Sequence, residues 1–140
     1  MADPCSASII TPLVFDLAAG DGITLPVPAE LAYDASEPLS VRITFWADAA
    51  GPVVWVFARD LLADGGWMPA GQGDIGIWPA VSDTKDAVCI ALSSPDGSAL
   101  LECDRGELAK FVSRAYAAVP REDETAYLDV DAAIDALLGR

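Results

Sequence analysis

The stretch VVWVFARDLLADGGWMPAGQGDIGIWP, Val53–Pro79, decides the fold of this chain. It opens with Val53–Ala58, where β-branched and aromatic residues dominate both faces, which predicts an interior strand. Just upstream, residues 39–46 alternate apolar and polar side chains with a period of two, typical of a strand with one face on the core. Because these two strands are neighbours in sequence, we expect them to pair as a hairpin.

The same stretch continues with a short helix and a second strand. Asp60 is placed to cap a helix over Leu61–Asp64, and Gly65-Gly66 can end that helix by adopting positive φ. Ala70–Trp78 is then predicted to be a Gly-interrupted strand, bulged or closely approached by another backbone, that Pro79 closes. The order strand, helical turn, strand with little loop between them indicates one rigid unit.

Two extended segments, Ile9–Leu17 and Ile23–Tyr33, precede this unit. Pro26 and Pro28 remove backbone donors from the second segment. We therefore expect that segment to be an edge strand or a bulged one.

A hairpin is predicted downstream, where Ser94–Gly97 separates the strands Ala87–Ser93 and Ser98–Cys103. The Pro-Asp-Gly sequence suits a three-residue loop, and the register that follows places Cys89 opposite Cys103. The chain has an odd number of cysteines, no CxxC spacing and no secretion signal. We therefore expect free thiols rather than a cross-strand disulfide.

A helix follows this hairpin. Asp104 and Glu107 have the spacing of a capping box, and Pro120 stops the pattern. A last helix is predicted over Ala132–Leu138, after an acidic linker. The apolar residues of the first of these helices fall on one face: Leu108, Phe111, Val112, Ala115 and Val119.

Length and composition indicate one α+β domain of antiparallel strands with C-terminal helices. A chain of 140 residues suits a single core, here about residues 9–120, with the acidic linker and last helix in 121–140. With 53% hydrophobic and only 21% charged residues, a monomer has little polar surface to cover it, so we expect an oligomer. The net charge of −14, with scattered basic residues, disfavours nucleic acid.

No catalytic, cofactor or metal site is predicted. The sequence contains no histidine, which removes Ser-His-Asp and Cys-His arrangements and histidine ligation of metals. Asp60 and Asp64 are explained by helix ends, and Gly71–Gly76 lacks the spacing of a phosphate-binding loop. Without a signal peptide or an apolar run long enough to cross a bilayer, we expect a cytoplasmic protein.

Trp67 and Met68 are the candidate contact residues, because they follow a glycine pair in a predicted loop. Two interpretations are open. The pair either contacts a partner or a second subunit, since aromatic and Met residues are enriched at interfaces, or it forms a lid on the core.

Four islands of sequence occur in the same order and at similar spacing in the SsgA-like sporulation and cell-division family of actinomycetes, which this chain therefore resembles. That resemblance implies a non-enzymatic regulator, with no cofactor, that places or regulates septum assembly, one member positioning the tubulin-like division protein FtsZ. It also implies a Whirly-like fold, a homotrimer, division or cell-wall synthesis proteins as partners and recruitment to the division septum. The islands are LPVPAELAYDASEP (Leu25–Pro38), VVWVFARDLLADG (Val53–Gly65), GQGDIGIWP (Gly71–Pro79) and VCIALSSPDGSALLE (Val88–Glu102).

At three positions the chain departs from the better-known members that it resembles. Trp46 stands where His is common, and Met68 and Gly76 stand where Arg is common. These changes remove charge around the predicted contact loop, so Trp46 and Gly76 join Trp67 and Met68 as candidate partner-binding residues. Two alternative functions are a chaperone-like activator of peptidoglycan-remodelling enzymes and, against the charge, a single-stranded nucleic-acid binder.

Overall fold

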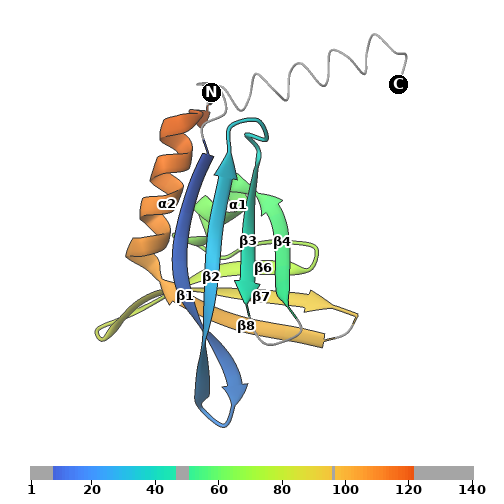
Figure 1. Ribbon diagram of the computed structural model, residues 1–140. Helices are drawn as coiled ribbons and strands as arrows, with labels where there is room; N and C mark the ends of the chain where they lie inside the picture. Colours follow the sequence, from blue (N-terminus) through green and yellow to red (C-terminus); the bar gives the residue numbers. More distant parts are fainter. Residues whose placement is uncertain (1–7, 47–50, 96, 122–140) are drawn as a thin grey trace.

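The computed structural model describes residues 8–46, 51–95 and 97–121. They form an α+β fold in which every strand pairing is antiparallel, as the sequence predicts (Figure 1). The elements in chain order are β1 (Ser8–Gly20), β2 (Ile23–Asp34), β3 (Ser40–Trp46), β4 (Pro52–Ala58), α1 (Arg59–Gly65), β5 (Ala70–Gln72), β6 (Ile75–Ser82), β7 (Lys85–Ser94), β8 (Gly97–Asp104) and α2 (Arg105–Ala118). The predicted helix Ala132–Leu138, the acidic linker beyond Arg121, and Cys5 lie outside the described residues.

The eight strands form one curled sheet in the order β4-β3-β2-β1-β8-β7-β6-β5. Its two halves join through only two residue pairs between β1 and β8, Asp16 with Glu102 and Leu17 with Leu101. Figure 1 shows β1–β4 running together while β6–β8 cross them at a steep angle, with α2 alongside β1. The sheet can therefore fold its inner faces toward each other.

The core fills the space between the two halves of the sheet. Alternate residues of each strand point into it, and Leu108, Phe111, Ala115 and Val119 add the apolar face predicted for α2. The buried strand residues form one cluster: Phe15, Val27, Ala29, Leu31, Tyr33, Val41, Ile43, Phe45, Ile75, Ile77, Val88, Ile90, Leu92, Leu101 and Cys103.

β1 and β2 form a long hairpin that the sequence analysis did not pair. Asp21 and Gly22 both have positive φ, at 54° and 74°, as the two central residues of a type I′ turn require. β2 lies between β1 and β3, so its prediction as an edge strand is wrong for the strand as a whole. β3 pairs with β2 only over Ala29–Ala32, however, so Pro26 and Pro28 lie where β2 has a single neighbour.

The prediction of an interior strand over Val53–Ala58 is wrong, because β4 is at the edge of the sheet. It forms the predicted hairpin with β3. Val53, Val54 and Val56 are nevertheless 48%, 53% and 55% exposed. The apolar pattern of β4 is real, but no described element covers either of its faces fully.

The Gly-rich segment after α1 is a hairpin, not one interrupted strand. β5 and β6 pair from Gln72 with Ile75, and Gly73 between them has a φ of 61°. Pro79 does not close the strand, because β6 continues to Ser82 with Pro79 opposite Val88. Gly73 thus serves a tight turn, while Gly71 and Gly76 lie opposite each other in the two strands.

Both predicted ends of α1 need correction. The helix begins after Ala58, with no side-chain cap, so Asp60 does not cap it. Gly66 caps the far end with a right-handed φ of −74°, not a positive one. Gly65 is instead required by packing, because a Cβ there would lie 2.2 Å from Cγ2 of Ile77.

The helix predicted after Asp104 is confirmed as α2. The Asp104 carboxylate accepts a hydrogen bond from the Glu107 backbone N–H at 2.8 Å, as a capping box requires. The helix ends at Ala118, with Val119 at its C-cap and Pro120 following. Local sequence signals therefore set both ends of this helix.

The predicted pairing of Cys89 with Cys103 is wrong by one residue. Ser94 pairs with Gly97, so Cys103 lies opposite Val88 and Cys89 lies opposite Glu102. A shift of one residue moves every side chain of a strand to the other face. Cys103 is therefore buried in the core and Cys89 is half-buried on the other face, both as free thiols.

The two thiols are expected to differ strongly in reactivity. Burial raises the pKa of Cys103 to about 12, whereas the pKa of Cys89 is raised by a smaller burial and by the nearby Glu102. Compared with an ordinary thiol of pKa 9, a pKa of about 12 leaves about a thousandfold less thiolate at pH 8. A disulfide-exchange reagent such as Ellman's reagent should label Cys89 in the native protein and Cys103 only after unfolding; equal rates would contradict the burial of Cys103.

Candidate functional site

The loop after α1 holds Trp67 and Met68 in a fixed position. The backbone N–H groups of both residues donate to the Asp64 carbonyl, each at 3.0 Å, so the loop continues the end of the helix. Their side chains point outward and are 75% and 60% exposed. Trp67 is therefore not a lid on the core, and the pair is an exposed apolar feature on a rigid backbone.

Arg105 at the start of α2 fixes the Trp67 ring. Its guanidinium carbon lies 4.2 Å from the ring centroid, a cation–π contact worth about 0.5–1 kcal/mol at an exposed site. The Nε donates to the Gly66 carbonyl at 2.8 Å, and Nη1 lies 3.5 Å from the Asp86 carboxylate. One arginine thus joins the loop, α2 and β7.

A groove of about 250 Å³ lies between Trp67, α1 and α2. Leu62 from α1, Val88 from β7 and Leu108 from α2 are apolar residues of its lining. Such a volume suits one or two apolar side chains of a partner, with Trp67 on the rim. The groove and the exposed pair together form the Trp67 site, which we define as Trp67, Met68 and the groove beside them.

The surroundings of the Trp67 site are acidic. Asp64 is exposed at the end of α1, and Asp104 and Glu107 are exposed at the start of α2. Arg105 in the groove lining and Lys110, with Nζ 3.4 Å from a Glu107 carboxylate oxygen, offset part of this charge. The site therefore combines an apolar centre with a negatively charged rim, which favours a partner that carries basic residues.

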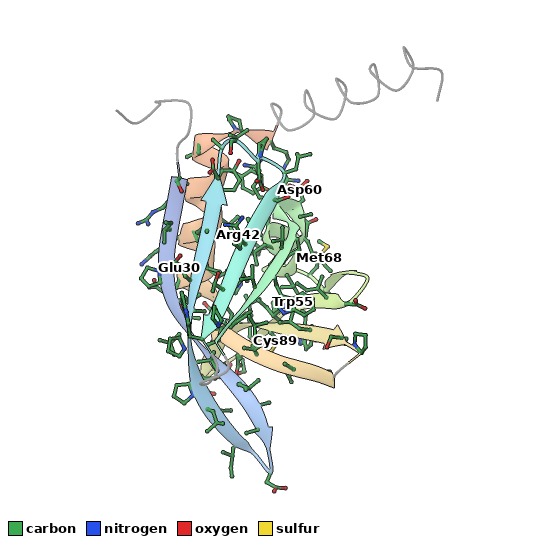
Figure 2. The ribbon with its side chains drawn as sticks, turned by 45° about the vertical axis from the view of Figure 1, so that its right-hand side comes forward. Glu30, Arg42, Trp55, Asp60, Met68 and Cys89 are labelled. Carbon is green, nitrogen blue, oxygen red and sulfur yellow. The ribbon has the colours of Figure 1, made fainter. Side chains whose placement is uncertain are left out.

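The structure brings together only part of the predicted site. Met68 adjoins Trp67, and Figure 2 shows its side chain beside α1. Gly76 on β6 pairs with Gly71 of β5, the strand that follows this loop. Trp46 lies apart, because it pairs with Pro52 at the end of the β3–β4 hairpin opposite to α1.

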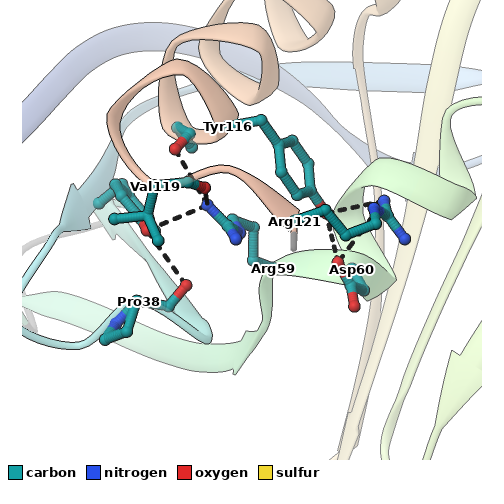
Figure 3. Close-up of polar contacts among 8 residues, drawn as sticks. Pro38, Arg59, Asp60, Tyr116, Val119 and Arg121 are labelled. Carbon is teal, nitrogen blue, oxygen red and sulfur yellow. Dashed lines mark hydrogen bonds and ion pairs between the residues drawn. The ribbon is translucent and has the colours of Figure 1, made fainter. Parts of the chain in front are cut away.

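A buried arginine, one of the scattered basic residues of the sequence, joins the two helices. Arg59, the first residue of α1, is fully buried. Its Nη1 contacts the Ala115 carbonyl at 3.0 Å, the Val119 carbonyl at 2.7 Å and the Tyr33 hydroxyl at 3.0 Å (Figure 3). Its guanidinium carbon also lies 4.0 Å from the centroid of the Tyr116 ring.

The position of Arg59 in the sequence could have indicated this contact. A cation in the first turn of a helix is unfavourable to the helix dipole, so Arg59 needs another reason to be there. The reason is the C-terminal end of α2, which carries partial negative charge: Arg59 binds the Val119 carbonyl there, and also the Ala115 carbonyl, which already accepts from the Val119 N–H. Arg59 supplies donors to that end and fixes α2 on α1.

Asp60 belongs to the same contact. Its carboxylate accepts a short hydrogen bond from the Tyr116 hydroxyl and lies 3.6 Å from Nη2 of Arg121 (Figure 3). Burial of the phenol, and then the bond to Asp60, raise the pKa of Tyr116 well above its ordinary value. Asp60 therefore holds the end of α2, which agrees with a structural role rather than a catalytic pair with Asp64.

Residues 8–46, 51–95 and 97–121 contain no group of three or more acidic or Cys side chains that could hold a metal ion. Neither helix among them is long and apolar enough to cross a membrane.

Comparisons with known proteins place this geometry in a family. The sequence model of the Streptomyces sporulation and cell division protein SsgA matches residues 27–124. The sporulation-specific cell division protein SsgB of Streptomyces coelicolor is 48% identical over 115 residues, which cover 82% of this chain and 84% of that protein. SsgB of Salinispora tropica is 47% identical over 124 residues, 87% of each chain.

Solved structures agree with the sequence comparison. One was reported with the finding that mutations in SsgB correlate to longitudinal cell division during sporulation of Streptomyces coelicolor; it has a TM-score of 0.82 and 43% identity, covering 89% of this chain and 98% of that one. An SsgA-like protein from Thermobifida fusca has a TM-score of 0.81 and 35% identity, covering 96% and 98%.

The chain belongs to the SsgA family of sporulation and cell division proteins. Within that family it is SsgB-like, and the names of its relatives support a role in sporulation-specific cell division.

Proposed function

We propose that this protein is a non-enzymatic regulator of sporulation-specific division that places or regulates septum assembly by binding another protein through the Trp67 site. Its partners are division proteins, FtsZ among them as the family resemblance implies, or cell-wall synthesis proteins. It acts in the cytoplasm and is recruited to the septum. The observation that carries the proposal is an exposed Trp-Met pair on a fixed backbone beside an apolar groove.

Three properties of the Trp67 site support binding. Tryptophan and arginine are both enriched among residues that dominate interface energies, and here Arg105 contacts Trp67. The backbone bonds to Asp64 and the Arg105 contact fix the pair before binding, which lowers the entropy cost of association. The acidic rim adds attraction to a basic partner at low salt.

We also propose that the protein is a homotrimer, as the family resemblance implies. The outer face of β1–β4 exposes Ile10 and Val14 from β1 and Val54 and Val56 from β4. Glu30, Arg42 and Thr44 of the middle strands β2 and β3 lie between them on the same face, so the surface is mixed, and exposed apolar residues in this number are typical of an interface. Sedimentation equilibrium at micromolar concentration should give three times the 14.6 kDa chain mass, and a monomer would contradict the proposal.

Replacing Trp67 and Met68 together by alanine should weaken partner capture by about 1–4 kcal/mol, the range of interface hot-spot residues. The measurement is capture of partners from lysate of the sporulating host by tagged protein, identified by mass spectrometry, then titration of the purified partner. Unfolding by urea should show a loss of no more than about 1 kcal/mol, that of the Arg105 contact.

Val81→Ala is the matched control, because Val81 is 62% exposed on β6 and lines no part of the groove. It should leave capture unchanged. Wild-type affinity in the double variant would disprove the contact assignment. Capture of nucleic acid in place of protein would instead favour the single-strand alternative.

A further inference from the structure

β4 is an unprotected sheet edge. Beyond it the sheet has no further strand among the described residues, and its register with β3 runs without a bulge. Natural edge strands are usually protected by charges, prolines, bulges or a covering element. β4 contains no charged residue, and its single proline, Pro52, is its first residue. Its valines are exposed on both faces: Val53 on the inner face, Val54 and Val56 on the outer.

The same chain protects another free edge. The part of β2 that extends beyond β3 carries Pro26 and Pro28, which lack the N–H groups that an added strand would need. The contrast indicates that the open edge of β4 serves a purpose. β4 has the apolar residues of a strand that is paired on both sides, but among the described residues it is paired only with β3.

An apolar groove of about 320 Å³ adjoins the inner face of β4. Val53 and Trp55 form one wall, and Leu92 and Ala99 from the β7–β8 hairpin form the other. None of the residues that line it is ionisable. A strand added to β4 would place alternate side chains in this groove, and those side chains must be uncharged.

The shape of the groove favours one extended segment over a second copy of this chain. In Figures 1 and 2 the tip of the β7–β8 hairpin reaches past β4 on its open side. A second copy that continued the sheet through its own β4 would bring its own β7–β8 hairpin into the same space. A single strand fits between the β4 edge and the hairpin.

We propose that β4 binds an extended, uncharged apolar segment of a partner protein by strand addition. Backbone groups of the segment pair with the free edge of β4, and alternate side chains fill the groove beside Val53 and Trp55. Basic residues at the ends of the segment are favoured by the net charge of −14. This surface is distinct from the Trp67 site, with which its lining shares no residue.

The probe is a peptide of three Val-Thr repeats between pairs of lysines, compared with the same peptide N-methylated at every residue of the repeats, which removes the donors of both strand edges. Hydrogen exchange of the full-length protein should show β4 amides slowed at least tenfold by the first peptide and unchanged by the second. Equal effects of both peptides, or none on β4, overturn the proposal. Slow exchange of the β4 amides in the protein without peptide would also overturn the proposal, because the edge would then already be covered by this chain. If that protection rises with protein concentration, the covering segment comes from a second copy.

Two variants complete the test. Val53→Lys places a charge in the groove and should weaken the first peptide at least tenfold, while Val81→Lys, equally polar at an exposed site outside the groove, should not. Wild-type binding by Val53→Lys overturns the proposal. The Trp67→Ala, Met68→Ala double variant should bind the peptide normally. A failure of the strand-addition proposal can therefore be distinguished from a failure of the proposed partner binding at the Trp67 site.

Discussion

Arg59→Met is expected to destabilise the protein by about 3–5 kcal/mol, because it leaves several buried oxygen acceptors without their charged donor. Arg59 is fully buried and contacts the Val119 carbonyl, the Ala115 carbonyl and the Tyr33 hydroxyl at 3.0 Å or less. Methionine fills part of the volume and donates to none of them. Val119 then keeps a buried carbonyl without its donor, and α2 loses its main polar attachment to α1.

Urea unfolding followed by tryptophan fluorescence measures this loss. Arg114→Met is the matched control, because Arg114 is an exposed arginine on α2 and its replacement should change stability by no more than about 0.5 kcal/mol. Arg59→Lys should fall between the two, since lysine keeps the charge without the planar fork. If Arg59→Met unfolds at the same urea concentration as wild type, the attachment of α2 by Arg59 is wrong.

Gly65→Ala is expected to cost about 3 kcal/mol, at the upper end of overpacking effects. The added Cβ would lie 2.2 Å from Cγ2 and 2.5 Å from Cβ of Ile77. Ile77 cannot move away easily, because β6 is paired on both sides, with β5 and with β7. The clash must therefore push α1 off the sheet, and with it the loop that carries Trp67.

Gly66→Ala is the control one residue along. Its added Cβ would lie 3.5 Å from the Ala63 carbonyl, an ordinary contact, and Gly66 already has a right-handed φ of −74°. The change should be neutral or stabilise by up to about 1 kcal/mol. Thermal unfolding of both variants tests the difference; equal midpoints would show that Gly65 does not pack as described.

The sequence predicted those elements whose signals are local. The alternation of residues 39–46 and the capping box at Asp104 each depend on a few adjacent residues, and β3 and α2 follow both. The β1–β2 hairpin could also have been found, since Asp21-Gly22 between two extended segments is a strong turn signal. In each of these patterns a few adjacent residues are enough to set the local backbone conformation.

What failed depends on contacts that are distant in sequence. The pattern of β4 gives an apolar strand, but whether it has one neighbour or two is decided by the order of the whole sheet. Gly65 meets Ile77 only because α1 packs on β6. The wrong partner for Cys89 is a local error instead: the β7–β8 loop is one residue shorter than predicted, which shifts the register.

Only the local features of the candidate site could be predicted from the sequence. Exposure of Trp67 and Met68 after a glycine pair could be inferred locally, and both are exposed. The groove, the Arg105 contact and the distance of Trp46 from the loop all depend on how α1, α2 and the β3–β4 hairpin are arranged. Whether these residues bind a partner remains a prediction.

The most direct test of the central claim is septum placement in the sporulating host after deletion of the gene and complementation. Deletion should disturb sporulation septa, and the wild-type gene or Val81→Ala should restore them. The Trp67→Ala, Met68→Ala variant, expressed at wild-type level, should not restore them. Normal septa in the deletion strain, or full restoration by the double variant, would contradict a division regulator that acts through the Trp67 site.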